Sequence, residues 1–189
     1  MWNEQIIMML LEGIKDTLYM TLTSTLIGYV IGLPMGILLT VTDKDGIHPN
    51  AAVYKVLDVI ANLIRSVPFL ILLIVLIPFT RFLIGRSYGP TATIVPLVIA
   101  AAPYIARMVE SSLKEVDAGV IEAARSMGAS NFTIVTKVML VEARTSLIVG
   151  ATISLGTILG YSAMAGTVAA VDLEISQSAM VIPDGRPIS

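Results

Sequence analysis

Four long apolar stretches dominate the chain, and short polar segments separate them. No charged residue occurs over residues 17–42 or over residues 145–171. Two further stretches cover residues 57–79 and 87–106, and prolines interrupt both of them. A helix that crosses a hydrocarbon core of about 30 Å needs about 20 apolar residues. The pattern therefore predicts an all-α integral membrane protein, a multi-span helical bundle with four spans.

Small residues recur at regular spacing within the first and last of these stretches. A ridge of small side chains lets another helix approach closely in the membrane. In the first stretch the ridge consists of Ser24, Gly28, Gly32 and Gly36. In the last stretch the small residues are Gly150, Ser154, Gly156 and Gly160. Both ridges are expected to pack against neighbouring helices.

Polar side chains enter the second stretch near its start and follow the third stretch at its end. Because charged groups are costly in lipid, they are expected to face the bundle or the interface. The first set is Asp58, Asn62 and Arg65, which lie near one helical face. The second set is Arg107, Glu110 and Lys114, spaced so that neighbours meet on one side of a helix.

The segment between residues 107 and 144 is the most charged part of the chain. Asp117 can cap a helix start, because its carboxylate accepts from freed N–H groups. Gly128 is suited to the left-handed residue that ends a helix, and Ser130 can cap a second helix at once. The segment is therefore predicted to form a helix, a glycine turn and another helix.

The first helix of this segment has three kinds of surface. A polar helix with a bare ridge, placed between membrane spans, suits docking of a partner better than chemistry. Its apolar stripe comprises Val120, Ile121, Ala124 and Met127. Its polar face comprises Glu122, Arg125 and Ser126, and its bare ridge comprises Gly119 and Ala123.

Composition excludes several functions. With 56% hydrophobic and 14% charged residues and a mean hydropathy of +0.86, the chain is not an ordinary soluble domain. The net charge is −2 and no basic run occurs, so no nucleic-acid partner is expected. There is no cysteine, and His48 stands in a polar loop, so no metal or other cofactor is expected. No secretory signal peptide is recognised, because the first apolar stretch is too long and follows an acidic flank.

Two sequence features bear on catalysis and on orientation. The chain contains no G-x-x-x-x-G-K-[ST] loop for ATP, and its spans offer no paired catalytic groups, so an enzyme is not expected. The loops at 43–58 and 107–144 carry two and five Lys or Arg residues, against one and two on the opposite side. By the positive-inside rule the N-terminus lies outside, and residues 107–144 face the cytoplasm.

Four short sequence motifs resemble those of a known transporter family. Glu122-Ala123-Ala124, followed by Gly128, resembles the cytoplasmic coupling loop of ABC importer permeases. Three further motifs are similar to those of the methionine-type permeases of that family, which have five spans per protomer. They are residues 65–69 (RSVPF), 102–110 (APYIARMVE) and 160–166 (GYSAMAG). The resemblance covers residues 1–168, which would form the transmembrane permease domain.

The resemblance implies a permease for D/L-methionine or a related amino acid in the cytoplasmic membrane. It implies a homodimer in membrane lipid, two ABC ATPase subunits and an extracytoplasmic substrate-binding lipoprotein. The residues that would couple to the ATPase are Glu122, Ala123, Ala124 and Gly128. Tyr161, Ser162 and Met164 would lie near the translocation path. Met164 would either help to close that path or serve as an ordinary core methionine.

Two departures from the family concern the helix that begins at Asn131. The family places proline after the residue that corresponds to Leu140, and again four residues later. This chain has Val141 and Thr145 at those positions. Without the prolines, the helix from Asn131 is expected to be able to run unbroken into the fourth span.

A third departure is the tail, residues 169–189, where the family continues with a glycine-rich loop and a fifth span. Within it, residues 172–189 are polar and are interrupted by Pro183, Gly185 and Pro187. One back-translation of it, read with a single added base, gives a glycine-rich loop like that of the family. We therefore expect a frameshifted tail and a protomer without its fifth helix. The alternatives left open are a truncated membrane fragment without transport activity and a permease for another amino acid.

Overall fold

The computed structural model describes the backbone of residues 4–87 and 89–179, with side chains up to Thr167. Within these residues every regular element is a helix. The long helices are α1 (Glu4–Thr42), α2 (Ala51–Ser66), α5 (Pro90–Lys114) and α9 (Arg144–Ala179). The short ones are α3 (Phe69–Val75), α4 (Ile77–Ile84), α6 (Ala118–Ser126), α7 (Asn131–Thr133), the π-helix η1 (Ile134–Met139) and α8 (Leu140–Glu142).

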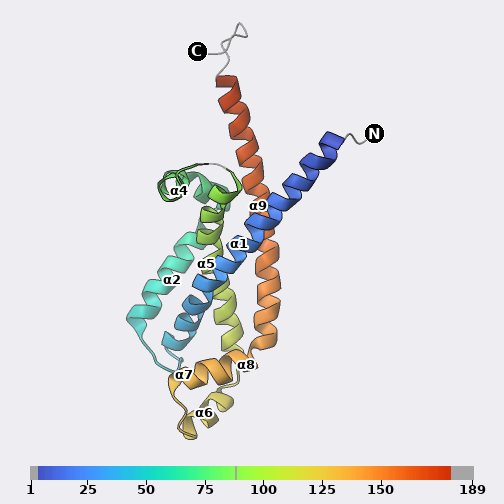
Figure 1. Ribbon diagram of the computed structural model, residues 1–189. Coiled ribbons are helices and arrows are strands. Elements are labelled where there is room, and N and C mark those ends of the chain that lie inside the picture. Colours follow the sequence, from blue (N-terminus) through green and yellow to red (C-terminus); the bar gives the residue numbers. More distant parts are fainter. Residues whose placement is uncertain (1–3, 88, 180–189) are drawn as a thin grey trace.

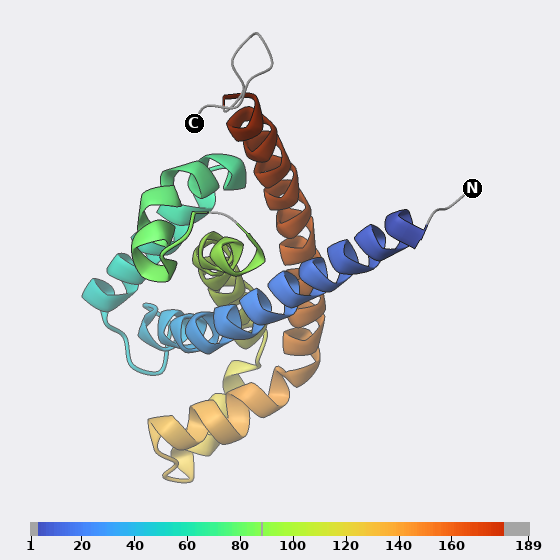
Figure 2. The ribbon, with the colours of Figure 1, turned by 45° about the horizontal axis from the view of Figure 1, so that its top comes forward.

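Helix α5 is the centre of the bundle. It packs against α1 most extensively and also contacts α2, α3, α4 and α9. Figure 2 shows α5 nearly end-on, with the other helices around it. In Figure 1 the segment α6–α8 lies at one end of the bundle, and the first turns of α1 lie toward the other end. Three helices are long and apolar enough to cross a membrane, or four if α2 and α3 form one bent span.

The second predicted span is divided at Val67 and Pro68. Helices α2 and α3 meet there at an angle of 101°. Val67 is extended, with φ −85° and ψ 125°, because the ring of the following proline disfavours the helical conformation. The interruption expected at Pro68 in the stretch 57–79 is therefore confirmed, and it takes the form of a sharp bend between two helices.

The third predicted span behaves differently, although it also contains prolines. Helix α5 continues through Pro96 and Pro103, both of which are buried, and extends to Lys114. Proline inside a membrane helix is tolerated where neighbouring groups satisfy the freed backbone. The expected interruption at these prolines is thus absent from α5.

The last helix reaches beyond the predicted end of the fourth span. Helix α9 continues to Ala179, whereas the apolar stretch ends at Val171. The frameshift assigned to residues 169–189 is not tested by this helix and stays a prediction. Its final part, residues 180–189, lies outside the described residues.

The glycine ridge of α1 packs directly onto α5, as predicted. A Cβ atom on Gly32 would lie 2.6 Å from the backbone oxygen of Ala102, and one on Gly36 would lie 2.5 Å from that of Ala106. The predicted ridge of α9 is confirmed only in part. A Cβ on Gly150 would meet Met108 at 3.6 Å, but Gly156 and Gly160 have no described atom within 4 Å of that position.

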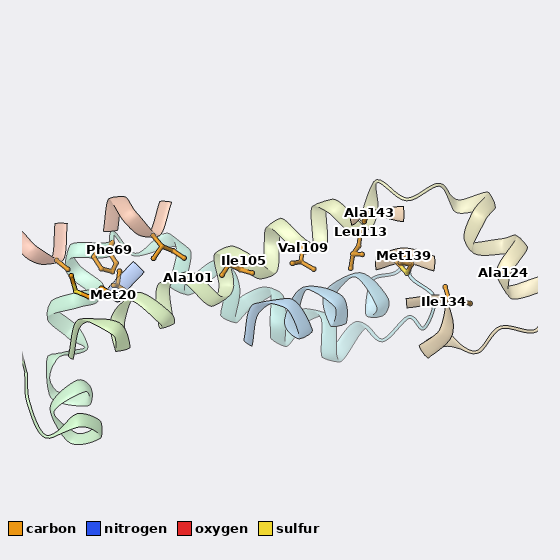
Figure 3. Packing of buried hydrophobic residues seen from close by; sticks show 13 residues of the cluster. Met20, Phe69, Ala101, Ile105, Val109, Leu113, Ala124, Ile134, Met139 and Ala143 are labelled. Carbon is orange, nitrogen blue, oxygen red and sulfur yellow. The ribbon is translucent and has the colours of Figure 1, made fainter. Parts of the chain in front are cut away.

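The buried apolar residues follow α5 from one end of the bundle to the other. Figure 3 shows this cluster, from Met20 and Phe69 at one end to Ile134 and Ala124 at the other. Ile105, in the middle of α5, is fully buried. The core thus connects the bent span directly to the segment α6–α8.

Candidate functional site

The segment α6–α8, residues 117–142, forms a helical hairpin whose ends are capped as predicted. Asp117 accepts a hydrogen bond from the backbone N–H of Gly119 at 2.7 Å. Gly128 takes the left-handed conformation, with φ 82°. Ser130 accepts from the backbone N–H of Thr133 at 3.3 Å and so caps the second arm. We refer to residues 117–142 as the hairpin.

The second arm of the hairpin does not run unbroken into the fourth span. Ala143 interrupts the helix between α8 and α9, with φ −75° and ψ 0°. Figures 1 and 2 show the arm turning there to become α9. Ala143 is buried in the core, so packing fixes this bend although Val141 and Thr145 stand where the family has prolines.

The predicted apolar stripe of α6 is divided between two faces. Ala124 is buried, and Ile121 is half-buried against the core. Met127, in contrast, exposes 82% of its surface, and Val120 exposes 41%. Glu122 and Ala123 are exposed, as predicted.

Phe132 is a further exposed apolar residue of the hairpin, and the sequence pattern did not predict it. It exposes 77% of its surface at the start of the second arm. A large aromatic residue two positions after the Ser130 cap was a signal that could have found it. The exposed residues of the hairpin therefore include apolar Met127 and Phe132 as well as polar Glu122.

The inner side of the hairpin is attached to the loop between α1 and α2. The Arg125 guanidinium donates a hydrogen bond of 2.8 Å to the backbone oxygen of Ile47. Ile47 also packs against the buried core. A cavity of about 590 Å³ lies between this loop and α6, with Lys114 and Glu122 among its lining residues. The hairpin is thus held to two separate parts of the bundle.

A chain of five charged side chains connects α1, α2 and α5 above the hairpin. Arg107 forms an ion pair with Asp58 and another with Glu110, the latter at 2.7 Å. The Lys114 ammonium lies 2.8 Å from Glu110 and 2.6 Å from Asp43. We call these five residues the charge ladder. Its three members on α5 were expected from their spacing, whereas the roles of Asp43 and Asp58 as their partners were not.

The charge ladder affects the titration of Asp43, which lies just after α1. The hydrogen bond from the Lys114 ammonium lowers the pKa of the Asp43 carboxyl group below its ordinary value. A lowered carboxyl pKa stabilises the folded state at neutral pH, and this contribution is lost as the pH falls through the lowered pKa. The contact between the end of α1 and α5 is therefore expected to weaken only in acid.

Tyr161 and Ser162, two of the predicted path residues, are packed inside the protomer. The ring of Tyr161 is stacked on Phe69, with centroids 4.6 Å apart and planes 9° apart. Ser162 is buried, and its hydroxyl accepts a hydrogen bond of 3.2 Å from Thr21. Met164 exposes 47% of its surface. Among the described residues of the single protomer, the Met164 side chain is therefore not buried.

Neither metal nor cofactor chemistry finds donors in the part of the chain that the structure describes. No group of three or more His, Cys, Asp or Glu side chains is close enough there to hold a metal ion. Both arms of the hairpin instead present surface without paired catalytic groups. The arrangement is that of a membrane helical bundle with an exposed helical hairpin at one end.

Comparison with known proteins assigns this bundle to a class. The model of the family described as binding-protein-dependent transport system inner membrane component matches residues 8–180. The chain belongs to this family, and it is a multi-pass protein of the inner membrane.

Individual relatives agree with this assignment. The D-methionine transport system permease protein MetI of Salmonella typhimurium is 51% identical over 164 residues, which cover 87% of this chain and 76% of the relative. The protein of the same name from Escherichia coli strain K12 is 51% identical over the same shares of both chains. A solved structure of the MetNI methionine ABC transporter in an inward-facing conformation is 50% identical. It superposes with a TM-score of 0.87 and covers 89% of this chain and 78% of that one.

Proposed function

We propose that the chain is the permease subunit of an ATP-driven importer that moves D-methionine or a related amino acid into the cell. The names of the relatives support this substrate, because three quarters of their length is covered at about half identity. The family assignment supports the role of the chain as the membrane component. In this role the chain acts as a homodimer and receives its substrate from an extracytoplasmic binding lipoprotein.

The exposed surface of the hairpin is the observation that carries the energy-coupling part of the proposal. The chain has no ATP-binding loop of its own, so the work must come from a partner ATPase. Met127 and Phe132 expose large apolar surfaces on the hairpin that also carries exposed Glu122 and Ala123, and exposed apolar surface is typical of protein interfaces. We assign Glu122, Ala123, Ala124 and Gly128 to this coupling, with buried Ala124 and left-handed Gly128 shaping the helix that the ATPase contacts.

Orientation follows from the same proposal. The hairpin lies on the cytoplasmic side, where ATP is available, and the N-terminus lies outside. The five Lys and Arg residues between residues 107 and 144 support this assignment. The hydrogen bond from Arg125 to Ile47 also supports it, because the two loops with more Lys and Arg than the opposite loops then lie at the same end of the bundle.

Met164 is the residue that we assign to closure of the path. Its side chain exposes 47% of its surface, whereas Tyr161 and Ser162 next to it are packed against α3 and α1. An exposed methionine on a helix that the partner protomer would cover is a flexible apolar plug. In the homodimer the two copies of Met164 would meet across the path.

Uptake in proteoliposomes tests the proposed function. The chain and its ATPase are reconstituted with ATP inside, and radiolabelled D-methionine with the binding lipoprotein is added outside. We expect the vesicles to accumulate label with ATP, and vesicles loaded with ADP to show no accumulation. Absence of uptake from a chain that still inserts and holds the ATPase would contradict the proposal. That result would favour the alternative of a truncated fragment without transport activity.

A further inference from the structure

A small cavity lies at the bend of the second span, between α2–α3, α5 and α9. Its volume is about 160 Å³, and Arg65, Phe69, Leu72, Tyr104 and Tyr161 are among the residues that line it. A water molecule occupies about 30 Å³ in the liquid, so the cavity has the volume of about five waters. Sites of this kind between the helices of a bundle are common places for small ligands.

Arg65 gives the cavity a positive charge that lacks a described counter-ion. No carboxylate among residues 4–87 and 89–167 lies within ion-pair distance of its guanidinium. Its described aromatic neighbour is Tyr104, whose ring centroid lies 5.9 Å from the guanidinium carbon. Arg107 on α5, in contrast, has both Asp58 and Glu110. Arg65 is exposed in the last turn of α2, so its guanidinium is accessible to an anion that enters the cavity.

The opposite wall of the cavity is apolar and aromatic. Phe69 and Tyr161 are stacked on each other, and Leu72 lies one turn beyond Phe69 on α3. Sulfur and aliphatic side chains pack favourably against aromatic rings. A guanidinium forms paired, charge-assisted hydrogen bonds with a carboxylate. The two walls therefore match the two ends of an α-amino acid with an apolar side chain.

We propose that this cavity is a transient binding site for the transported amino acid, with Arg65 binding its carboxylate and with Phe69, Leu72 and Tyr161 contacting its side chain. The inference rests on the proposed function and specifies where in the protomer the substrate is held. The ring faces of Tyr104 and Tyr161 offer the substrate ammonium a cation–π contact. The bend at Val67 and Pro68 turns α3 away from the axis of α2, and Phe69 at its start stacks on Tyr161 of α9.

Photolabelling tests the site without requiring transport. The detergent-solubilised chain in complex with its ATPase, without the binding lipoprotein, is irradiated with the diazirine analogue of methionine. Peptide mass spectrometry then locates the adducts. We expect adducts on Leu72, Tyr104 or Tyr161, with their yield reduced by excess methionine. Adducts confined to other segments, or no adducts at millimolar probe, would overturn the proposal.

Variants define the role of the guanidinium. Arg65→Gln should lower the adduct yield at least about tenfold, the equivalent of about 1.4 kcal/mol, whereas Arg65→Lys should retain part of it. Arg81→Gln is the matched control, since Arg81 is exposed on α4 outside the cavity, and it should leave the yield unchanged. An unchanged yield in Arg65→Gln contradicts the site.

A second measurement covers the case in which Arg65→Gln does not fold. Methioninol, which has a hydroxyl group in place of the carboxylate, should fail to compete with the probe on the unaltered chain. Effective competition by methioninol would show that the carboxylate is not recognised.

Failure of the site and failure of the proposed function remain distinguishable. Uptake without adducts rejects only the site, and adducts without uptake reject only the transport function.

Discussion

Replacing Gly32 with leucine should cause one of the largest losses of stability available in this chain. A Cβ atom at this position would lie 2.6 Å from the backbone oxygen of Ala102 and 2.9 Å from two side-chain atoms of Ile105. Backbone cannot move away as a side chain can, so α1 must separate from α5 to admit the larger residue. Overpacking of this kind costs about 3 kcal/mol. Thermal unfolding of the detergent-solubilised protein, followed by size-exclusion chromatography, measures the loss.

Gly13→Leu is the matched control, because it makes the same substitution on the same helix. A Cβ on Gly13 has no described atom within 4 Å. Leucine is a better helix former than glycine by about 1 kcal/mol, so this variant should be as stable as the parent or slightly more stable. Equal stability of Gly32→Leu and the parent would mean that the ridge faces lipid. That result would contradict the packing of α1 on α5.

Glu110→Gln should cause a second large loss, this time without any change in volume. The Glu110 side chain is 6% exposed and accepts from Arg107 at 2.7 Å and from Lys114 at 2.8 Å. Glutamine at this position removes the buried carboxylate that Arg107 and Lys114 share, although each cation keeps its second partner, Asp58 or Asp43. Loss of hydrogen bonds between charged groups at a buried position costs about 2 kcal/mol. The free energy of unfolding in detergent should fall by this amount.

Glu115→Gln provides the control for charge, since Glu115 is the exposed cap residue directly after α5. Substitutions at exposed positions without partners usually change stability by less than about 0.5 kcal/mol. Salt offers an independent check. Because Glu110 is buried, 1 M salt should not reproduce the effect of Glu110→Gln. If both glutamate variants lose the same stability, the charge ladder does not hold α5 to its neighbours.

The parts of the fold that the sequence predicted correctly depend on neighbouring residues along the chain. Asp117, Gly128 and Ser130 cap and end the arms of the hairpin as expected, because capping is decided within one turn of helix. The small ridge of α1 was recognisable for the same reason, since its spacing follows from helical geometry. Glu122 and Ala123 were correctly placed on the exposed side of α6.

The parts that could not be predicted depend on contacts between distant segments. Pro68 ends a helix, whereas Pro96 and Pro103 lie inside one, although the local rule is the same for all three. This difference arises from tertiary packing, because α5 contacts several other helices and these contacts support a continuous helix through both prolines. Pairing of Asp58 with Arg107 joins residues 49 positions apart, and no periodicity reveals such a pair.

The same limit applies to the candidate site. Phe132 was not predicted because its exposure depends on which side of the second arm packs against the bundle. The cavity beside Arg65 could not be predicted, because it depends on the packing of Phe69 against Tyr161, which are distant in the sequence. Local sequence patterns thus predict the hairpin and its exposed face, whereas the proposed substrate site depends on contacts in the assembled bundle.

Co-purification of the ATPase tests most directly whether the hairpin is where the partner docks. Ala123→Arg places a long charged side chain in the middle of the exposed face of α6, where the parent presents a methyl group. Ala52→Arg makes the same change on the exposed first turn of α2, outside the hairpin, and serves as the control. We predict that Ala123→Arg inserts normally but retains at least about tenfold less ATPase, a loss of about 1.4 kcal/mol or more. The control should retain the ATPase, and normal retention by Ala123→Arg would contradict docking through the hairpin.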